Sequence, residues 1–254
     1  VRAIMHGCNG HMGQVITGLI KADEGIELVA GIDKYTGIAN DYPVFESLEK
    51  CDVEADVIID FTSAKAVDGL IAYSAEKKVP VVLCTTGLSV EQLKSLEEAS
   101  SQVAVLRSAN MSLGINMLMK ILQDAAKILV PAGFDIEIVE KHHNRKLDAP
   151  SGTALALADA INDGVLGGEY EYKYDRSQDH KKREKKEIGI SAVRGGTIVG
   201  DHDVIFAGTD EVITFSHTAY SRAIFGKGAI QAAKYLAGKP AGFYHMSDVI
   251  NAQV

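Results

Sequence analysis

The 254-residue chain is 46% hydrophobic and 24% charged, and its formal net charge is −8. This composition excludes a disordered chain, and the acidic balance excludes recruitment of nucleic acid or an anionic membrane surface by the chain as a whole. No stretch approaches about 18 consecutive apolar residues, and the sequence starts directly in a strand-like run, so we expect a cytoplasmic protein that binds no membrane.

The first 110 residues alternate short β-rich runs with helical patterns. Alternation of this kind predicts parallel strands joined by crossover helices. The runs VIID and VVL are apolar throughout, which is typical of strands covered by helices on both faces. We expect an α/β fold with a Rossmann-like doubly wound parallel sheet, its strands in RAIMH, IELVAGID, ADVIIDFT, VPVVLCTTG and QVAVLRSA and its helices at about 14–22, 64–76 and 90–100.

The pattern changes after Asn110. Apolar residues recur at helical spacing in residues 111–129, which predicts one helix that bridges two domains. Residues 134–140 then alternate with period two, SGTALALADAIND is helical, and residues 190–221 read as strands separated by RGG and GTDE turns. This predicts a second, α+β domain with a mixed or antiparallel sheet. A last helix, GKGAIQAAKYLAGKP, is followed only by a short tail.

Three glycines, Gly7, Gly10 and Gly13, follow the first predicted strand and precede a helix. A pyrophosphate needs backbone N–H groups at a helix N-terminus without a side chain in the way. The GxxGxxG spacing differs from the usual GxGxxG and is also compatible with a ligand-free turn. Asp33 ends the next strand 20 residues after Gly13, where an acidic residue would bind a ribose hydroxyl. Together these residues predict a dinucleotide site.

The cofactor preference depends on two neighbouring charges. Asp33 should repel a 2′-phosphate, whereas Lys34 could attract one, so we expect NADH to be favoured and NADPH to be tolerated. The segments 60–63 and 84–87 fall at the carboxyl ends of later strands, where open α/β sheets bind ligands. They are equally compatible with polar loop caps.

Residues 140–155, EKHHNRKLDAPSGTAL, combine groups that suit an anionic substrate. His142 supplies an imidazole, the side chain most often used for acid/base catalysis, and Lys146 carries an ammonium four residues later. Ser151 can cap the helix that follows, which leaves the amides of Gly152 and Thr153 directed outward as a seat for an anion. Each residue alone has a plain structural explanation, and only the combination indicates function.

The sequence predicts no metal site. The adjacent histidines could bind a metal, but no third ligand lies near them at helical or strand spacing. The cysteines Cys8, Cys51 and Cys84 are far apart and show no CxxC spacing, which also argues against disulfides.

The stretch EKHHNRKLDAPSGTA resembles the E-x-H-H-x-x-K-x-D-x-P-S-G-T-A signature of the dihydrodipicolinate reductase family at every fixed position. The likeness extends along the whole chain, through the glycine loop, CTTG, SANMSLGIN, AVRGGTIVGDHDVIFAG and SHTAYSR. It implies NAD(P)H-dependent reduction of 4-hydroxy-tetrahydrodipicolinate, a small cyclic dicarboxylate, in the diaminopimelate route of lysine biosynthesis. It also implies a dinucleotide-binding domain (1–110 plus 223–254), a substrate and oligomerisation domain (111–222), and a homotetramer.

The resemblance implies a role for each matching position. His142 becomes the candidate acid/base and Lys146 the proton donor. The substrate would be held by His143, Lys146, Ser151, Gly152 and Thr153. The cofactor would be held by Gly7, Cys8, Asn9, Gly10, His11 and Met12 at the pyrophosphate, Asp33 with Lys34 at the adenosine ribose, Thr85, Thr86 and Gly87 at the nicotinamide ribose, and Ala109, Asn110 and Met111 at the nicotinamide end. His11 stands where relatives often have arginine, which removes one possible phosphate contact.

Two alternatives remain open from the sequence. The chain could be another Rossmann dehydrogenase that acts on an imino acid or a semialdehyde, although such an enzyme need not bind a dicarboxylate at a helix N-terminus. It could also be a non-enzymatic redox sensor that binds NADH, which would have little use for Lys146 beside His142. The basic run DHKKREKKE is interrupted by acidic residues and has no interleaved aromatics, so we expect a solvated loop there and no nucleic-acid partner.

Overall fold

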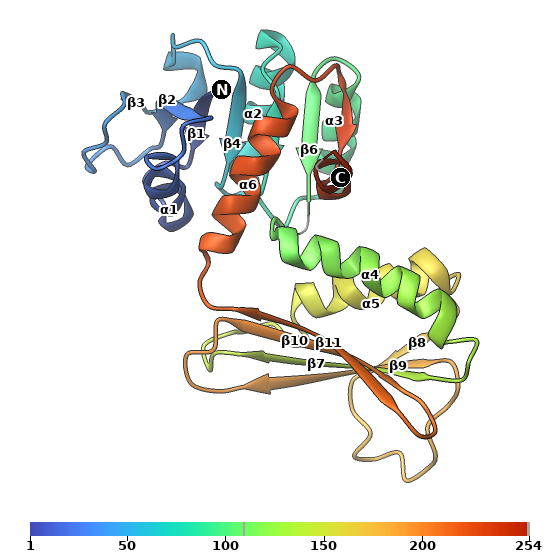
Figure 1. Cartoon of the computed structure of the whole chain (residues 1–254). Helices are drawn as coiled ribbons and strands as arrows, with labels where there is room; N and C mark the ends of the chain where they lie inside the picture. Colours follow the sequence, from blue (N-terminus) through green and yellow to red (C-terminus); the bar gives the residue numbers. More distant parts are fainter. Residues whose placement is uncertain (109, 253–254) are drawn as a thin grey trace. The chain divides into compact units, whose positions relative to one another are not determined.

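The computed structural model describes residues 1–108 and 110–252 of the chain (Figure 1). The chain forms two compact units, residues 1–113 with 223–254 (unit 1) and residues 114–222 (unit 2). Unit 1 is therefore assembled from both ends of the sequence, and unit 2 is one continuous insertion. None of the helices among the described residues is both long enough and apolar enough to span a membrane.

Within the described residues, unit 1 contains a seven-stranded parallel sheet in the order β12-β6-β5-β4-β1-β2-β3. The chain builds outward from β1 to one edge, then returns and continues from β4 to the other edge. The reversal between β1 and β4 is the position where open α/β sheets bind ligands at the carboxyl ends of the strands. The strands are β1 (Arg2–His6), β2 (Glu27–Ile32), β3 (Val44–Phe45), β4 (Val57–Asp60), β5 (Val81–Leu83), β6 (Ala104–Arg107) and β12 (Gly242–Tyr244).

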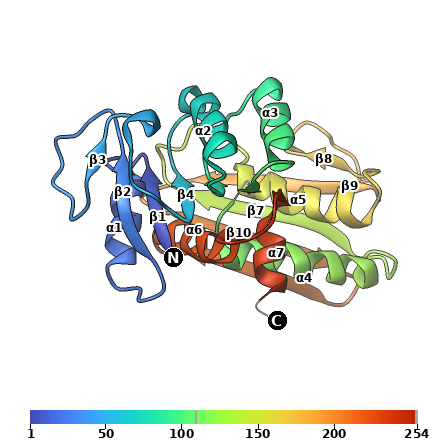
Figure 2. The same ribbon diagram turned by 90° about the horizontal axis from the view of Figure 1, so that it is seen from above.

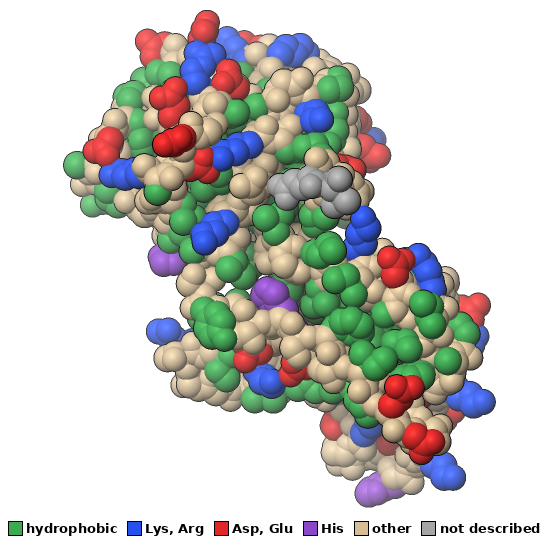
Figure 3. Space-filling model, in the orientation of Figure 1, with side chains coloured by type: hydrophobic (Ala, Val, Ile, Leu, Met, Phe, Trp, Pro, Cys, Tyr) green, Lys and Arg blue, Asp and Glu red, His purple; other side chains and the backbone are tan. Residues whose placement is uncertain are grey.

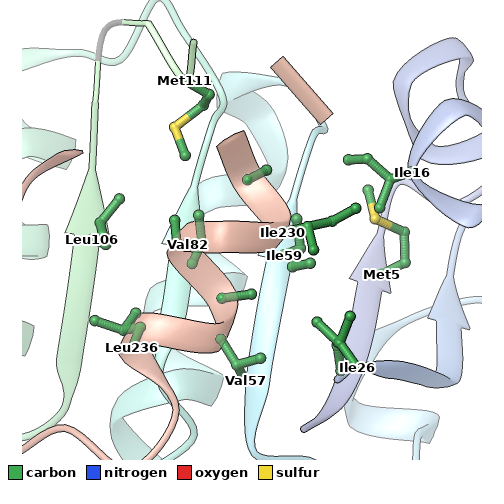
Figure 4. Packing of buried hydrophobic residues seen from close by; sticks show 14 of the residues in the cluster. Met5, Ile16, Ile26, Val57, Ile59, Val82, Leu106, Met111, Ile230 and Leu236 are labelled. Atoms are coloured by element: carbon green, nitrogen blue, oxygen red, sulfur yellow. The ribbon is translucent and has the colours of Figure 1, made fainter. Parts of the chain in front are cut away.

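Helices cover both faces of this sheet, which explains its continuous apolar strands. Figure 2 shows α2 and α3 on one side and α1, α6 and α7 on the other. Successive residues of a strand serve opposite faces: Met5 packs with the α1 and α6 side, whereas Ile4 packs with the α2 and α3 side. The first of these two cores is drawn in Figure 4. The helices are α1 (His11–Ile20), η1 (Leu48–Lys50), α2 (Ala64–Lys77), α3 (Val90–Ser100), α6 (Ala223–Leu236) and α7 (Met246–Asn251).

Within the described residues 114–222, unit 2 forms a five-stranded mixed sheet in the order β11-β10-β7-β9-β8. The pairs β10–β11 and β10–β7 are antiparallel, and the pairs β7–β9 and β8–β9 are parallel. Helices α4 and α5 lie on one face of the sheet and bury its apolar side chains (Figure 1). The elements are α4 (Leu113–Leu129), β7 (Asp135–His142), α5 (Gly152–Val165), β8 (Glu171–Lys173), β9 (Glu187–Arg194), β10 (Gly200–Ala207) and β11 (Val212–Ala219).

The predicted fold class, a Rossmann-like parallel sheet with a second mixed sheet, is confirmed. The expectation of a short tail after the last helix is incomplete, because the tail forms β12 and α7. Strand β12 extends the sheet by pairing with β6, and α7 buries Met246 and Val249 in the core. A three-residue strand carries too little periodicity to be identified from sequence.

Candidate functional site

The glycine loop connects β1 to α1 and is shaped by close backbone packing. Gly7 has φ +84°, and a Cβ there would lie 2.6 Å from the carbonyl oxygen of Phe61. A Cβ on Gly13 would lie 2.2 Å from the carbonyl oxygen of Gly7. These two glycines are therefore required by the turn itself. Gly10 is exposed and forms the N-cap of α1 without a side chain over the first amides, as a bound pyrophosphate requires.

Asp33, directly after β2, ties the glycine loop to the segment that follows it. Its carboxylate accepts a hydrogen bond from the backbone N–H of Asn9 and another from that of Tyr35, each at 3.0 Å. The side chain of Asn9 in turn bonds the carbonyl of Tyr35 and accepts from Asn40 at 2.9 Å. Asp33 is thus held at the carboxyl edge of the sheet, where it can accept from a ribose hydroxyl.

A cavity of about 480 Å³ opens beside this loop within unit 1. Its volume is within the range of small-molecule sites. Its walls come from the glycine loop, the carboxyl end of β2, the turn around η1 and the start of α2. The lining residues are His6, Gly7, Gly10, Ile32, Asp33, Lys34, Glu46, Ser47, Leu48, Glu49, Phe61, Thr62, Ser63, Lys65, Ala66, Gly69 and Leu70. The cavity therefore includes four of the predicted cofactor residues, Gly7, Gly10, Asp33 and Lys34.

A buried carboxylate, Asp60, organises the carboxyl ends of the central strands. The hydroxyl of Thr85 donates to it at 2.6 Å and the hydroxyl of Thr62 at 2.7 Å, and Nδ1 of His6 lies 2.8 Å from it. The hydroxyl of Thr85 also accepts from the backbone N–H of Thr62. In the structure the hydroxyl of Thr85 therefore joins the ends of two strands. Thr86, in the same loop, is exposed, and its hydroxyl can contact a ligand.

The remaining predicted cofactor residues differ in accessibility. The side chain of Cys8 is fully buried, and its sulfur occupies the space beside Gly31, so only its backbone could contact a ligand. Met111 is 3% exposed and packs in the core of unit 1, whereas His11 is exposed. Met12 is part-buried in the first turn of α1, Lys34 and Gly87 are exposed in loops, and Asn110 is buried. Ala109 lies outside the described residues.

In unit 2, the carboxylate of Glu140 is the centre of a buried hydrogen-bond network. Glu140 lies in β7 and is fully buried. Nη1 and Nη2 of Arg194 each donate to it at 2.7 Å, the backbone N–H of Ser151 donates at 2.9 Å, and Nδ1 of His142 lies 2.6 Å away. Burial raises the pKa of Glu140, but the hydrogen bonds from Arg194 and His142 outweigh it and bring the pKa below its ordinary value. Glu140 is therefore ionised at neutral pH, and its hydrogen bonds hold together β7, the end of β9 and the residue before α5.

His142 is the last residue of β7, so the chain leaves the sheet between the two histidines. The residue is 8% exposed, and because Nδ1 faces the Glu140 carboxylate, Nε2 is the nitrogen that can exchange a proton. A Cβ on Gly200 would lie 3.0 Å from Nε2, so any side chain at that position would crowd this edge of the ring.

His143 and Lys146 lie on the turn after β7. His143 is half-buried, and burial, reinforced by the positive charges of Arg145 and Arg222, lowers its pKa. It is therefore a neutral hydrogen-bonding group at pH 7. The side chain of Lys146 is 21% exposed, and its Nζ lies 2.8 Å from Asp148, which is 57% exposed. The ammonium is thus close to the surface and held by an exposed partner.

Helix α5 begins directly after this turn. Ser151 is its N-cap, and the hydroxyl oxygen accepts from the backbone N–H of Ala154 at 3.1 Å. A Cβ on Gly152 would meet no atom within 4 Å, and its φ is not left-handed. Protein packing therefore does not explain this glycine, whereas close approach of a ligand to the helix start does. The structure brings His142, Lys146, Ser151 and Gly152 to one end of unit 2.

Sequence reasoning missed the buried groups behind this surface. Glu140 is part of the motif 140–155 but has no predicted role there, and neither Arg194 nor His202 is among the residues predicted for the site. A signal for Glu140 was available: strand β7 alternates, so Glu140 falls on the same face as Ile136 and Ile138 and must be buried. A carboxylate on an apolar face requires a cationic partner.

Side chains of both charges are interspersed on the face shown in Figure 3, in keeping with the absence of a continuous basic run in the sequence. Among the described residues, no group of three or more His, Cys, Asp or Glu side chains is arranged to hold a metal ion.

Comparison with known proteins identifies the family. Residues 1–111 match the model for the dihydrodipicolinate reductase N-terminus, and residues 114–250 match the model for the C-terminus of the same family. The chain is 56% identical over 250 residues to 4-hydroxy-tetrahydrodipicolinate reductase of Caldanaerobacter subterraneus (98% of each chain). It is 52% identical over 252 residues to that of Clostridium tetani (99% of this chain, 98% of the other).

Comparison with a solved structure supports the same family. The dipicolinate-bound dihydrodipicolinate reductase from Paenisporosarcina sp. TG-14 superposes with a TM-score of 0.81 at 25% identity, covering 96% of this chain and 97% of that one. Both units of the fold and the sequence of every segment therefore agree with one family. The chain belongs to the dihydrodipicolinate reductase family.

Proposed function

We propose that the chain reduces 4-hydroxy-tetrahydrodipicolinate to tetrahydrodipicolinate, with NADH or NADPH as the reductant, in the diaminopimelate route of lysine biosynthesis. The observation that carries this proposal is the full-length match to reductases of this name, at up to 56% identity among the relatives given above. The solved relative carries dipicolinate, a planar dicarboxylate, which supports a small dicarboxylate as the ligand of unit 2.

The residues of unit 1 suit a dinucleotide. The uncapped start of α1 supplies amides for the pyrophosphate, Asp33 accepts from the adenosine ribose, and the cavity of about 480 Å³ takes the adenosine. Lys34 lines the same cavity and can pair with a 2′-phosphate, so both cofactors fit. When bound, the nicotinamide supplies the hydride. Thr86, Gly87 and Asn110 are the positions we assign to its ribose and amide end.

The start of α5 suits a carboxylate. The first amides of a helix have no intrahelical acceptor, and the helix dipole adds a partial positive charge there. Gly152 leaves this place uncovered, and His143 lies on the turn beside it as a neutral donor. We assign the substrate carboxylates to the amides of Gly152 and Thr153, to His143 and to Lys146.

The proton that must follow the hydride comes from unit 2. The 4-hydroxyl group of the substrate leaves as water, and hydride addition to C4 of the resulting ring, which is conjugated with an imine, leaves electron density that an acid has to quench. Lys146 is a charged donor whose side chain is 21% exposed, and His142 has one ring nitrogen free for proton exchange because Glu140 engages the other. We therefore assign Lys146 as the proton donor and His142 as the acid/base group that works with it.

The test is an absorbance assay at the nicotinamide band with freshly generated substrate and each cofactor in turn. Consumption of both NADH and NADPH is expected, whereas cofactor binding without consumption would support the redox-sensor alternative. Lys146→Ala should lower kcat by about 10²–10⁴-fold, the range of general acid assistance. Unchanged turnover in both Lys146→Ala and His142→Ala would remove the assignment of the acid.

We also infer a homotetramer in the cytoplasm, on the family resemblance of the whole chain. Light scattering of the purified protein tests the oligomeric state, with a mass of four chains as the expected value. A monomer or a dimer at assay concentration would contradict it.

A further inference from the structure

His202 occupies a buried position that no proposed role explains. It lies in β10 and is 4% exposed, and its Nε2 is 3.0 Å from the hydroxyl oxygen of Ser151. Its ring meets that of His142 edge to face, with centroids 5.2 Å apart and planes at 76°. We propose that His202 is a positioning residue for the carboxylate site: it holds the Ser151 oxygen and leaves the hydroxyl hydrogen to donate to a ligand carboxylate at the start of α5.

The sheet fixes the backbone under this contact. His202 pairs with Glu140 on β7 and with His217 on β11, so it is hydrogen-bonded into the middle of three strands. Glu140 independently holds the backbone N–H of Ser151 at 2.9 Å. The N-cap residue is therefore anchored from one row of the sheet at two points, by its N–H and by its hydroxyl.

The protonation state of His202 determines which hydrogen bonds its ring can donate. Burial, with a further contribution from the neighbouring His142, lowers the pKa of His202 to about 4. At neutral pH the imidazole is therefore uncharged and carries one proton, on either Nδ1 or Nε2.

The surroundings select the nitrogen that carries the proton. Nδ1 has no hydrogen-bond partner among the described residues, whereas Nε2 faces the hydroxyl of Ser151. A buried N–H without an acceptor is rarer in proteins than a buried acceptor without a donor. We therefore place the proton on Nε2, which donates to the hydroxyl oxygen.

The consequence falls on Ser151. Its oxygen accepts from Nε2–H of His202 and from the backbone N–H of Ala154, so both lone pairs are used. Neither bond uses the hydroxyl hydrogen, which can donate to an anion at the same helix start as the amide of Gly152. With the other tautomer the hydroxyl would donate to His202 and could not serve a ligand. This inference rests on the proposed dicarboxylate ligand.

The first experiment measures the tautomer directly. In the full chain labelled with ¹⁵N-histidine, the Nε2–H form of His202 should be observed at pH 7, and binding of dipicolinate should leave it unchanged. His202→Gln identifies its resonances by their loss. An Nδ1–H tautomer would overturn the proposal, whatever the catalytic activity of the chain.

The second experiment measures dipicolinate affinity by calorimetry, which is independent of turnover. His202→Leu should raise the dissociation constant about tenfold, and His202→Gln, whose amide N–H can replace Nε2–H, should stay within about threefold. In a Ser151→Ala background, His202→Leu should add less than about twofold, because the hydroxyl through which it acts is gone. His217→Gln, in the same row of the sheet, is the matched control and should not change the affinity.

The outcomes separate the two proposals. The positioning role would be overturned if His202→Leu raised the dissociation constant equally in the wild-type and Ser151→Ala backgrounds. It would also be overturned if neither His202→Leu nor Ser151→Ala alone changed the dissociation constant. Should His202→Leu fail to fold, the glutamine variant and the tautomer measurement still decide it. Dipicolinate binding without reductase activity would overturn the proposed function and leave the role of His202 standing.

Discussion

The buried carboxylate of Glu140 provides the sharpest test of how the site is built. Its two oxygens act only as acceptors. They accept two hydrogen bonds from the guanidinium of Arg194, one from the backbone N–H of Ser151 and one from Nδ1 of His142. Glu140→Gln keeps the shape but replaces one oxygen with an NH₂ group that faces these donors. It also leaves the guanidinium of Arg194, 20% exposed, without its counter-charge. Breaking a buried pair in this way costs about 3–5 kcal/mol.

The assay is urea unfolding of the whole chain, followed by circular dichroism and by activity, because two units need not unfold together. The matched control is Glu137→Gln, on the same strand. The Glu137 side chain is 33% exposed, and we expect its ion pairs to contribute no more than about 1 kcal/mol. Equal losses in the two variants, or an unchanged midpoint for Glu140→Gln, would refute the idea that burial makes this network rigid.

The same network predicts a dependence on acid. The pKa of Glu140 lies below its ordinary value, so its ionisation stabilises the folded chain above the unfolded pKa, near pH 4.3 for a free glutamate. That contribution is lost as the pH falls through the lower, folded pKa. Below about pH 4, the wild-type chain should therefore lose stability more steeply than Glu140→Gln. Parallel curves for the two proteins would contradict this.

Three further predictions concern the ligand sites. Gly152→Ala should raise the KM for the substrate at least about tenfold with little change in melting temperature, since a Cβ there meets no protein atom; an unchanged KM would mean that no ligand approaches. Gly13→Ala should destabilise unit 1 and weaken cofactor binding, because its Cβ would lie 2.2 Å from a carbonyl oxygen. Gly18→Ala in the same helix, with open space around it, should be neutral or stabilising by about 0.5–1 kcal/mol in thermal unfolding. Asp33→Asn should raise the KM for NADH more than that for NADPH, and Lys34→Ala should do the reverse; equal effects on the two cofactors would contradict the charge argument.

The parallel sheet could be predicted because its strands are apolar runs separated by helices, a pattern that local sequence carries by itself. Met5 and Ile4 serve different cores, and neither position can be polar. Strand β12 could not be predicted in the same way. Its three residues become a strand only by pairing with β6, more than a hundred positions earlier, and that pairing is a tertiary effect.

The site shows a similar division. The motif from Glu140 to Ser151 could be read from the sequence because its groups are close in the chain and chemically distinctive. His202 and Arg194 could not, because each comes from a different strand and only the register of β7 with β10 and β9 brings them to Glu140 and Ser151. The predicted ribose contact of Thr85 stays a prediction, and the bond of its hydroxyl to Asp60, which comes from another strand, could not be predicted from the sequence.

Buried and exposed groups thus have different tasks in unit 2. The Glu140–Arg194 pair brings one charge of each sign, so it adds no net charge beside a dicarboxylate while it fixes the turn and the start of α5. On the assignment proposed above, the attraction for the ligand comes from Lys146 and the helix amides. Because Lys146 is held by a mostly exposed Asp148, an ion pair of that kind contributes only about 0–1 kcal/mol, and a ligand carboxylate can replace it at little cost. The buried Glu140–Arg194 pair therefore holds the site in place, whereas the more exposed Lys146–Asp148 pair can exchange its partner.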